Sequence, residues 1–261
     1  MYLHSIPLFS DSYCIKQKLS SIPLILNKEG VNIVTLEDPV EYFLMGVNHS
    51  QVKPEIKYGF AEGLRHTLRQ DPDIIMVGEA RDEETASLII HASLTGHIVL
   101  STLHTNNSAG VIPRLVDMGV QSFLIPSALS LAIAQRLVGV LCDDCKKKKK
   151  PNQEIKDLIE KEMEYLPEEY RKKTKVSFSE VYEAVGCKKC NWRGYKGRIG
   201  IYEVLSVTDE LSEIIGSNLT EDKIWEEAHR QGMVTLRQDG IIKALKGVTT
   251  IEEIIRVTQE Y

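Results

Sequence analysis

Three short segments of the chain, residues 31–36, 73–77 and 97–103, are almost continuously apolar instead of alternating between apolar and polar residues. Continuous apolar runs of this length are typical of strands that are buried on both faces, as in a parallel sheet. No other feature restricts the possible folds as much, because parallel strands need crossover segments that cover the faces of the sheet.

The segments between these runs have the spacing of amphipathic helices. In residues 60–68 an apolar side chain recurs at every fourth position, and Pro72 ends the pattern soon afterwards. Residues 86–94 form a second helical pattern, which Gly96 follows at a position typical of helix C-termini. The alternation of strands and helices predicts an α/β fold wound by crossovers.

Each predicted strand is followed by side chains that can take part in chemistry. Glu37 and Asp38 follow the first strand, Glu79 the second and His104 the third. Because open α/β sheets bind ligands at the carboxyl ends of their strands, we expect these side chains to share one site. The alternatives are structural: acids in a solvated loop, a helix-capping acid and a satisfied histidine. His97 lies at the opposite end of its strand and is the weaker candidate.

The acids and nearby arginines suit phosphoryl chemistry. A carboxylate at Glu37 could position or deprotonate a water, and an apolar strand ending in an acid such as Glu79 can present that acid to magnesium. Arg65, Arg69 and Arg81 lie beside these segments. Arginine can neutralise the charge on a transferring phosphoryl group, often from a neighbouring subunit, although a surface ion pair accounts for each of them equally well.

One part of such a site is missing from the sequence. An acid-ended strand of this kind normally works with a glycine-rich loop that ends in Gly-Lys-Ser/Thr and binds phosphate through its backbone N–H groups. Residues 8–19 contain no glycine. We therefore expect the chain as written not to turn over ATP, because acids without these donors and the lysine repel the nucleotide.

The chain has five cysteines, and four of them form CxxC pairs, Cys142 with Cys145 and Cys187 with Cys190. Two such pairs can supply four thiolates to one tetrahedral zinc ion, which predicts a structural site that is closed to water. Chance spacing or redox-active pairs are the alternative. Cys14 stands alone. No secretion signal is recognisable, so the pairs indicate a reducing cytosol.

Charge and hydropathy exclude two kinds of partner. The net charge of −5 argues against nucleic acid. No apolar run approaches the roughly 18 residues that a membrane span needs. The lysine run at 146–150 and the charged residues that follow predict a solvated insertion at 146–180 between the cysteine pairs, and a nucleic-acid patch is the less favoured alternative.

The last third of the chain predicts four short helices. Thr208 can cap the first, and Gly232 ends the second. The third starts at Leu236. Thr250 and Glu253 have the spacing of a capping box for the last helix, so we expect a helical unit at the C-terminus.

Three motifs together resemble the secretion ATPases of the type II secretion and type IV pilus assembly family. They are VTLEDPVEY at 34–42, GLRHTLRQDPDIIMVGE at 63–79 and TGHIVLSTLHT at 95–105, and they correspond to the Asp box, Walker B and His box of that family. AQRL at 134–137, the paired CxxC and GRIGIYE at 197–203 are similar to the extension subfamily rather than the retraction subfamily. The resemblance covers residues 27–261.

The resemblance implies a RecA-like P-loop core that hydrolyses ATP with magnesium in a homo-hexameric ring. It implies that Glu37 positions or activates water, that Glu79 is the Walker B carboxylate and that His104 belongs to the His box. Arg65 and Arg81 would meet phosphate at or across subunit interfaces. The family further implies a cytoplasmic protein that is peripheral to the inner membrane, with an inner-membrane platform protein of a pilus or secretion machine as its partner.

Four regions follow from these expectations. They are an atypical segment at 1–26, where the P-loop would fall at 9–16; a RecA-like core at 27–140; a four-cysteine zinc insertion at 141–200; and a helical C-terminal unit at 201–261. Family members carry a large region before the core. A frameshift or a wrong start codon would produce the N-terminal segment, and real loss of the P-loop is the alternative. The alternative function is a non-hydrolysing, zinc-stabilised interaction subunit or an inactive gene remnant.

Overall fold

The computed structural model describes residues 6–10, 21–168, 170–171 and 179–259. Contacts between residues divide the chain into two compact units. The first comprises Met1–Ala134 and Leu205–Glu227, and the second comprises Gln135–Val204 and Ala228–Tyr261.

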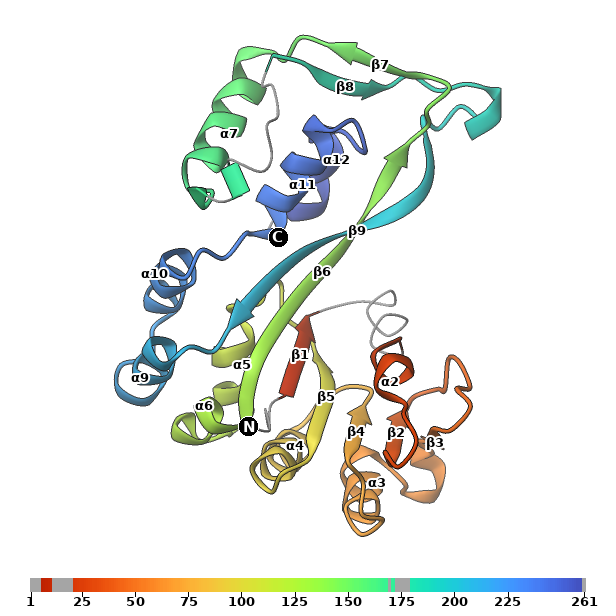
Figure 1. Ribbon diagram of the computed structural model, residues 1–261, viewed down its shortest axis with the longest axis vertical. Coiled ribbons are helices and arrows are strands. Elements are labelled where there is room, and N and C mark those ends of the chain that lie inside the picture. The colour runs from red at the N-terminus through yellow and green to blue at the C-terminus, as the bar shows by residue number, and fades with distance from the viewer. Residues whose placement is uncertain (1–5, 11–20, 169, 172–178, 260–261) are drawn as a thin grey trace. The chain divides into compact units, whose positions relative to one another are not determined.

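A mixed set of short and long strands makes up the main sheet. Seven strands of the described chain are arranged in the order β3-β2-β4-β5-β1-β6-β9 (Figure 1). The pairings from β3 through β6 are all parallel. The three strands that the sequence predicts are present and adjacent as β2, β4 and β5. The strands are β1 (Ile6–Ser10), β2 (Ile33–Glu37), β3 (Asn48–Gln51), β4 (Ile74–Val77), β5 (Ile98–Leu103), β6 (Leu129–Leu141) and β9 (Tyr195–Ser206).

Two described segments near the start of the chain, residues 6–10 and 21–26, have regular structure although each contains a proline. β1 lies between β5 and β6, and its register against β6 shifts between Ile6 and Pro7. A proline, which has no N–H to donate, fits a sheet at such an irregularity. The helix α2 (Ser21–Leu26) contains Pro23 in its first turn, where a missing N–H removes no helical hydrogen bond.

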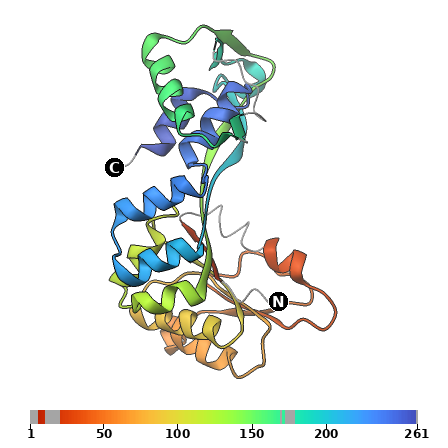
Figure 2. The ribbon, with the colours of Figure 1, turned by 60° about the vertical axis from the view of Figure 1, so that its left-hand side comes forward.

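Apolar side chains of β2, β4 and β5 fill both faces of the sheet. Ile33 and Met76 belong to a buried cluster on one face, against which Leu26 of α2 packs. On the other face Leu36 lies so close to Gly63 of α3 (Phe60–Thr67) that a Cβ at this glycine would stand 2.8 Å from the leucine side chain. Figure 2 shows α2 (red) on one side of these strands and α3 and α4 (orange to yellow) on the other.

The helices of the first unit largely follow the sequence pattern. α4 (Glu83–Leu94) begins after Asp82, whose carboxylate accepts a hydrogen bond from the Thr85 N–H, and Gly96 follows it with a φ of +107°. No helix in the described part of the chain is long and apolar enough to cross a membrane. The remaining elements here are η1 (Pro54–Ile56), α5 (Val111–Asp117), η2 (Ser122–Leu124), α6 (Ile125–Ala128) and α9 (Asp209–Ser217); α10 (Glu221–Arg230) extends into the second unit.

The lysine run of the second unit is a strand, which corrects the expectation of a solvated insertion. β7 (Lys146–Lys149) pairs antiparallel with β8 (Val181–Ala184). Between them, α7 (Gln153–Glu164) buries Ile159 and Met163. Strand pairing satisfies the backbone of the lysines while their long side chains remain partly in water, so a run of like charge did not reveal the strand.

Two of the predicted helix caps are confirmed. The Thr208 hydroxyl accepts from the Leu211 N–H at the start of α9, and the Thr250 hydroxyl accepts from the Glu253 N–H at the start of α12 (Ile251–Thr258). The Glu253 carboxylate, however, accepts hydrogen bonds from the Gly139 N–H and from Arg256. This acid therefore ties α12 to β6 and does not serve the reciprocal half of the predicted capping box.

The C-terminal helices divide between the two units. α9 packs against α6 and η2, whereas α11 (Leu236–Leu245) packs against α7, β8 and α12. α11 starts with a capping box that the sequence analysis missed, in which Thr235 and Gln238 each accept from the other's backbone N–H. The sequence predicts one helical unit at 201–261. In the structure, α9 belongs to the first compact unit, whereas α11 and α12 belong to the second.

Candidate active site and metal centre

The carboxyl edge of the parallel strands collects three of the predicted site residues. Glu37 is the last residue of β2, Glu79 follows β4 after a glycine, and His104 comes directly after β5. Because β2, β4 and β5 are neighbouring parallel strands, these residues leave the sheet at one edge. The arrangement has the geometry of a ligand site in an open α/β sheet.

Glu79 is the most enclosed acid of this edge, with a side chain that is only 2% exposed. Its Oε1 lies 2.5 Å from Nη2 of Arg81, and its Oε2 lies 3.0 Å from Nε2 of His104. The hydrogen bond to Glu79 is the main reason why the pKa of Arg81 is raised, and the charge of Asp38, 3.9 Å away, adds to it. Arg81 thus links the acids that follow β2 and β4.

Glu37 is held by a separate set of contacts. Its Oε1 accepts a hydrogen bond from the Thr35 hydroxyl at 2.7 Å and lies 2.9 Å from Nδ1 of His49. His49 belongs to β3 and stands opposite Thr35 in the register. The sequence alone does not single out His49, because a lone histidine in a short polar strand follows no recognisable pattern.

The other basic candidates lie elsewhere. Arg65 pairs with Glu62 on its own helix and with Glu84 of α4, and these exposed contacts raise its pKa, chiefly through the hydrogen bond to Glu84. The ring of His97 is 2.9 Å from the Ala92 carbonyl oxygen at the end of α4. The structure therefore brings Arg81, but neither Arg65 nor His97, to Glu79.

The segment predicted to stand in place of a P-loop, residues 9–16, lies mostly outside the described residues. Phe9 and Ser10 are the end of β1, and Ser10 pairs with Leu103 of β5. β1 therefore ends at the same edge of the sheet as β5, beside the strand that leads to His104.

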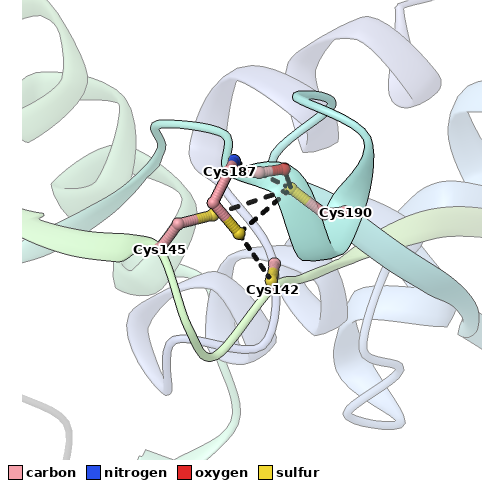
Figure 3. A group of neighbouring side chains, drawn as sticks. All are labelled: Cys142, Cys145, Cys187 and Cys190. Carbon is pink, nitrogen blue, oxygen red and sulfur yellow. Dashed lines mark hydrogen bonds between the residues drawn. The ribbon is translucent and has the colours of Figure 1, made fainter.

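The four paired cysteines form one cluster (Figure 3). Their sulfur atoms all lie within 4.8 Å of one another. Cys145 and Cys190 approach to 3.8 Å and Cys142 and Cys187 to 4.0 Å. In a tetrahedral zinc site with bonds of about 2.3 Å, the sulfurs stand about 3.8 Å apart, so this spacing fits one ion. All four are free thiols.

Two of the four thiols have pKa values that are shifted in opposite directions. Burial raises the pKa of Cys145 to about 12. At Cys190 burial acts in the same direction, but the N–H groups of Cys187 and Gly194, helped by the neighbouring thiols, outweigh it and lower the pKa to about 6. Four thiolates at this distance repel one another, and a divalent cation removes that cost.

Two glycines permit the turns around the second pair. Gly186 has a φ of +92°, and a Cβ there would stand 2.7 Å from the Trp192 carbonyl oxygen. Gly194 has a φ of +77°, and its Cβ would meet the Ala184 side chain at 2.6 Å. Only glycine fits these positions without movement of the backbone, so the two glycines permit the turns that hold the second cysteine pair.

Comparison with known protein families matches residues 17–256 to the family described as "Type II/IV secretion system protein". The chain is 46% identical over 235 residues to the type II secretion system ATPase E of Vibrio cholerae. It is 48% identical over 236 residues to the type IV pilus assembly ATPase PilB of Acinetobacter baylyi. Each alignment covers 90% of this chain but only 44% and 39% of the respective relatives, so the chain spans less than half of their length.

Solved structures share the fold at lower identity. The crystal structure of the pilus retraction motor PilT with bound ADP matches with a TM-score of 0.68 and 22% identity, covering 98% of this chain and 62% of that one. The ATPase DotB of Legionella pneumophila matches with a TM-score of 0.63 and 22% identity, covering 95% and 58%. At this identity the two structures show the fold alone.

Proposed function

The chain belongs to the type II/IV secretion system protein family, and we propose that it provides the hydrolytic core of an ATPase that powers type II secretion or type IV pilus assembly. The observation that carries the proposal is the acid cluster at the carboxyl edge of the sheet. Glu79 is buried there between Arg81 and His104, and Glu37 ends the adjacent strand.

The residues of this edge have distinct roles in the proposed reaction. Glu79 would hold magnesium, which supplies charge neutralisation for the nucleotide phosphates. Glu37 would orient the attacking water or take its proton. The Arg81 guanidinium, which bridges towards Asp38 in this structure, would neutralise charge on the transferring phosphoryl group, and His104 would donate to Glu79 or to phosphate.

The cysteine cluster supports a second, structural part of the proposal. Cys142, Cys145, Cys187 and Cys190 would hold one zinc ion and leave no position for water. Such an ion would join the end of β6 to the turn before β9, since Cys142 and Cys145 follow β6 whereas Cys187 and Cys190 precede β9.

The proposed assembly rests on the resemblance to the secretion ATPase family. A type II secretion ATPase and a pilus assembly ATPase act within larger machines, so we propose a homo-hexameric ring at the cytoplasmic side of the inner membrane, in contact with a platform protein. Arg65 is exposed on α3, where an arginine could reach the nucleotide of a neighbouring subunit.

The glycine-free segment at 8–19 favours a second candidate, a non-hydrolysing zinc-stabilised subunit. The test compares the chain as written with a version in which residues 1–26 are replaced by a segment that contains Gly-x-x-x-x-Gly-Lys-Thr and a following helix. Nucleotide affinity and magnesium-dependent ATPase rate are measured for both.

We expect binding and turnover only in the loop-restored chain, because the loop supplies the N–H donors and the lysine that hold phosphate. Failure of the restored, folded chain to bind nucleotide would contradict the ATPase proposal and support the non-hydrolysing subunit. Turnover by the unmodified chain that depends on Glu79 would show that the loop is dispensable.

A further inference from the structure

His49 is a buried histidine that the proposed roles do not yet use. It comes from β3, at the edge of the sheet, and its side chain is only 6% exposed. Its two ring nitrogens contact different groups. Nδ1 lies 2.9 Å from Oε1 of Glu37 and 2.9 Å from the Thr35 hydroxyl, while Nε2 accepts a hydrogen bond from the Leu44 N–H at 2.9 Å.

The Leu44 contact determines which nitrogen of His49 carries the proton. A backbone N–H can only donate, so Nε2 must present its lone pair, and a protonated Nε2 would place two hydrogens against each other. In the neutral ring the proton then sits on Nδ1 and points at Glu37. The hydroxyl of Thr35 donates to the same carboxylate oxygen at 2.7 Å.

This arrangement fixes the rotation of the Glu37 carboxylate. Both donors meet Oε1, and within the described residues no side-chain hydrogen bond to Oε2 is found. Oε2 is then the oxygen presented to a water or a ligand. Free rotation about the terminal bond of a glutamate would otherwise exchange the two oxygens, since this torsion is broad and roughly two-fold.

The loop between β2 and β3 holds the imidazole in turn. Leu44 secures one edge of the ring, and Phe43 meets it edge to face, with ring centroids 5.5 Å apart. The same loop begins at Asp38, which faces Arg81. The loop that follows Glu37 therefore holds the His49 ring in place, and His49 in turn orients the Glu37 carboxylate.

We propose that His49 is a positioning residue, which holds the Glu37 carboxylate in one orientation through an Nδ1–H tautomer imposed by the Leu44 N–H. The use of that orientation on a water rests on the proposed function, but the orientation itself is measured without nucleotide. A purely structural histidine would fill space and support the loop without controlling the state of Glu37.

The experiment uses the whole chain with nitrogen-labelled histidine and carboxyl-labelled glutamate. Nitrogen NMR reports the tautomer of each ring, and the spectrum of His49→Gln identifies the signals of His49. Glu37→Gln identifies the carboxyl carbon of Glu37. Two substitutions then separate the roles: His49→Phe keeps a flat ring without donor or acceptor, whereas His49→Gln offers an NH₂ group as donor and a carbonyl oxygen as acceptor.

We expect the Nδ1–H tautomer at His49, a displaced Glu37 carboxyl resonance in His49→Phe, and a resonance near its original position in His49→Gln. His66→Phe is the matched control, because His66 is exposed on α3 and pairs only with Glu62 among the groups of the described chain. It should leave Glu37 unchanged.

An Nε2–H tautomer at His49 would overturn the proposal. So would an unmoved Glu37 resonance in a folded His49→Phe variant. If that variant does not fold, the tautomer of the unmodified chain and the Glu37 resonance in His49→Gln still decide the question. If the loop-restored chain fails to bind nucleotide, the ATPase proposal is contradicted, but these spectra do not change. The inference about His49 therefore stands or falls independently of the ATPase proposal.

Discussion

The cysteine cluster and the acid edge of the sheet are assembled in opposite ways. Each half of the cysteine cluster is a CxxC pair in one turn of the chain, and the four thiols complete a set of ligands by themselves. The acid edge takes single residues from the ends of β2, β4 and β5, and β1 ends beside them. Its chemistry depends on each contributing strand.

Two local motifs are therefore enough to supply the ligands of the cysteine cluster, whereas the acid edge forms only when several strands of the sheet are in place. The cysteine cluster should bind its ion whether or not the acid edge is complete. The acid edge contains acids and bases that contact one another, yet phosphate binding also needs the N–H donors of a loop. A change at one region should therefore leave the chemistry of the other intact, and the following predictions test that independence.

The largest effect is expected from loss of one of the four thiols that are proposed to hold zinc. Cys145→Ser should abolish stoichiometric zinc binding, because apparent binding energies of four-cysteine sites in peptides are about 10–16 kcal/mol and three thiolates hold the ion far less well. Elemental analysis and thermal unfolding with and without a chelator provide the measurement. Acid should release the ion as well, since protons compete for the thiolates.

Cys14→Ser is the matched control for this prediction, because Cys14 belongs to neither CxxC pair. It should retain one zinc ion per chain. A protein with well under one zinc ion per chain, and with a melting temperature that a chelator does not change, would contradict the metal centre.

The next largest effect concerns the acid edge. In the loop-restored chain, Glu79→Gln should lower kcat by at least about 100-fold, because the amide cannot supply the charge that holds magnesium in place. Zinc content should remain unchanged. Steady-state ATPase assays provide the measurement, with Glu62→Gln on the exposed face of α3 as the control. Equal decreases of kcat in Glu79→Gln and Glu62→Gln would contradict a specific role of the buried acid Glu79 in hydrolysis.

A smaller effect is expected at His49. In the loop-restored chain, His49→Phe should lower kcat about tenfold with KM within about twofold, because a Glu37 carboxylate that is free to rotate still acts on the water but holds it less well. His49→Gln should recover most of the rate because it keeps a donor for Glu37. A change confined to KM would place His49 in nucleotide binding rather than in orientation of the acid.

The smallest effect tests packing beside the cysteine cluster. Thr250 caps α12 and also shares a hydrogen bond of 2.9 Å with the Tyr195 hydroxyl. Thr250→Ala should cost about 1–2 kcal/mol of unfolding free energy in the zinc-loaded chain, measured by urea denaturation, whereas Thr250→Ser should cost less. Identical costs would mean that the hydroxyl does not contribute.

The sequence predicts the centre of the fold well because buried parallel strands are apolar throughout. β2, β4 and β5 follow directly from that pattern. β7 does not, because lysines carry no apolar signal and only the pairing with β8 makes them a strand. β6 and β9 were also missed. β6 mixes buried and half-exposed positions without a simple alternation, and β9 has exposed residues near its start and later buries the acid Glu203, which is not typical of a strand.

Site residues could be predicted from the sequence only where the signal lies in neighbouring residues of the chain. The cysteines identify themselves by their spacing, and the acids do so by following apolar strands. His49 could not be found in this way, because its importance comes from β3 lying beside β2 and from the return of Leu44 to its ring. The sequence also does not tell which arginine contacts Glu79. Only the structure shows that Arg81 pairs with this acid and that Arg65 does not.

The interleaved course of the chain has a practical consequence for dissecting the protein. The polypeptide passes from one compact unit to the other after Ala134, after Val204 and after Glu227. No single cut can then yield a fragment that contains one unit complete and nothing else. Separate expression of either unit would require joining two distant segments by an artificial linker, and a protease that cleaves once between 141 and 195 should leave two pieces that remain associated until denatured.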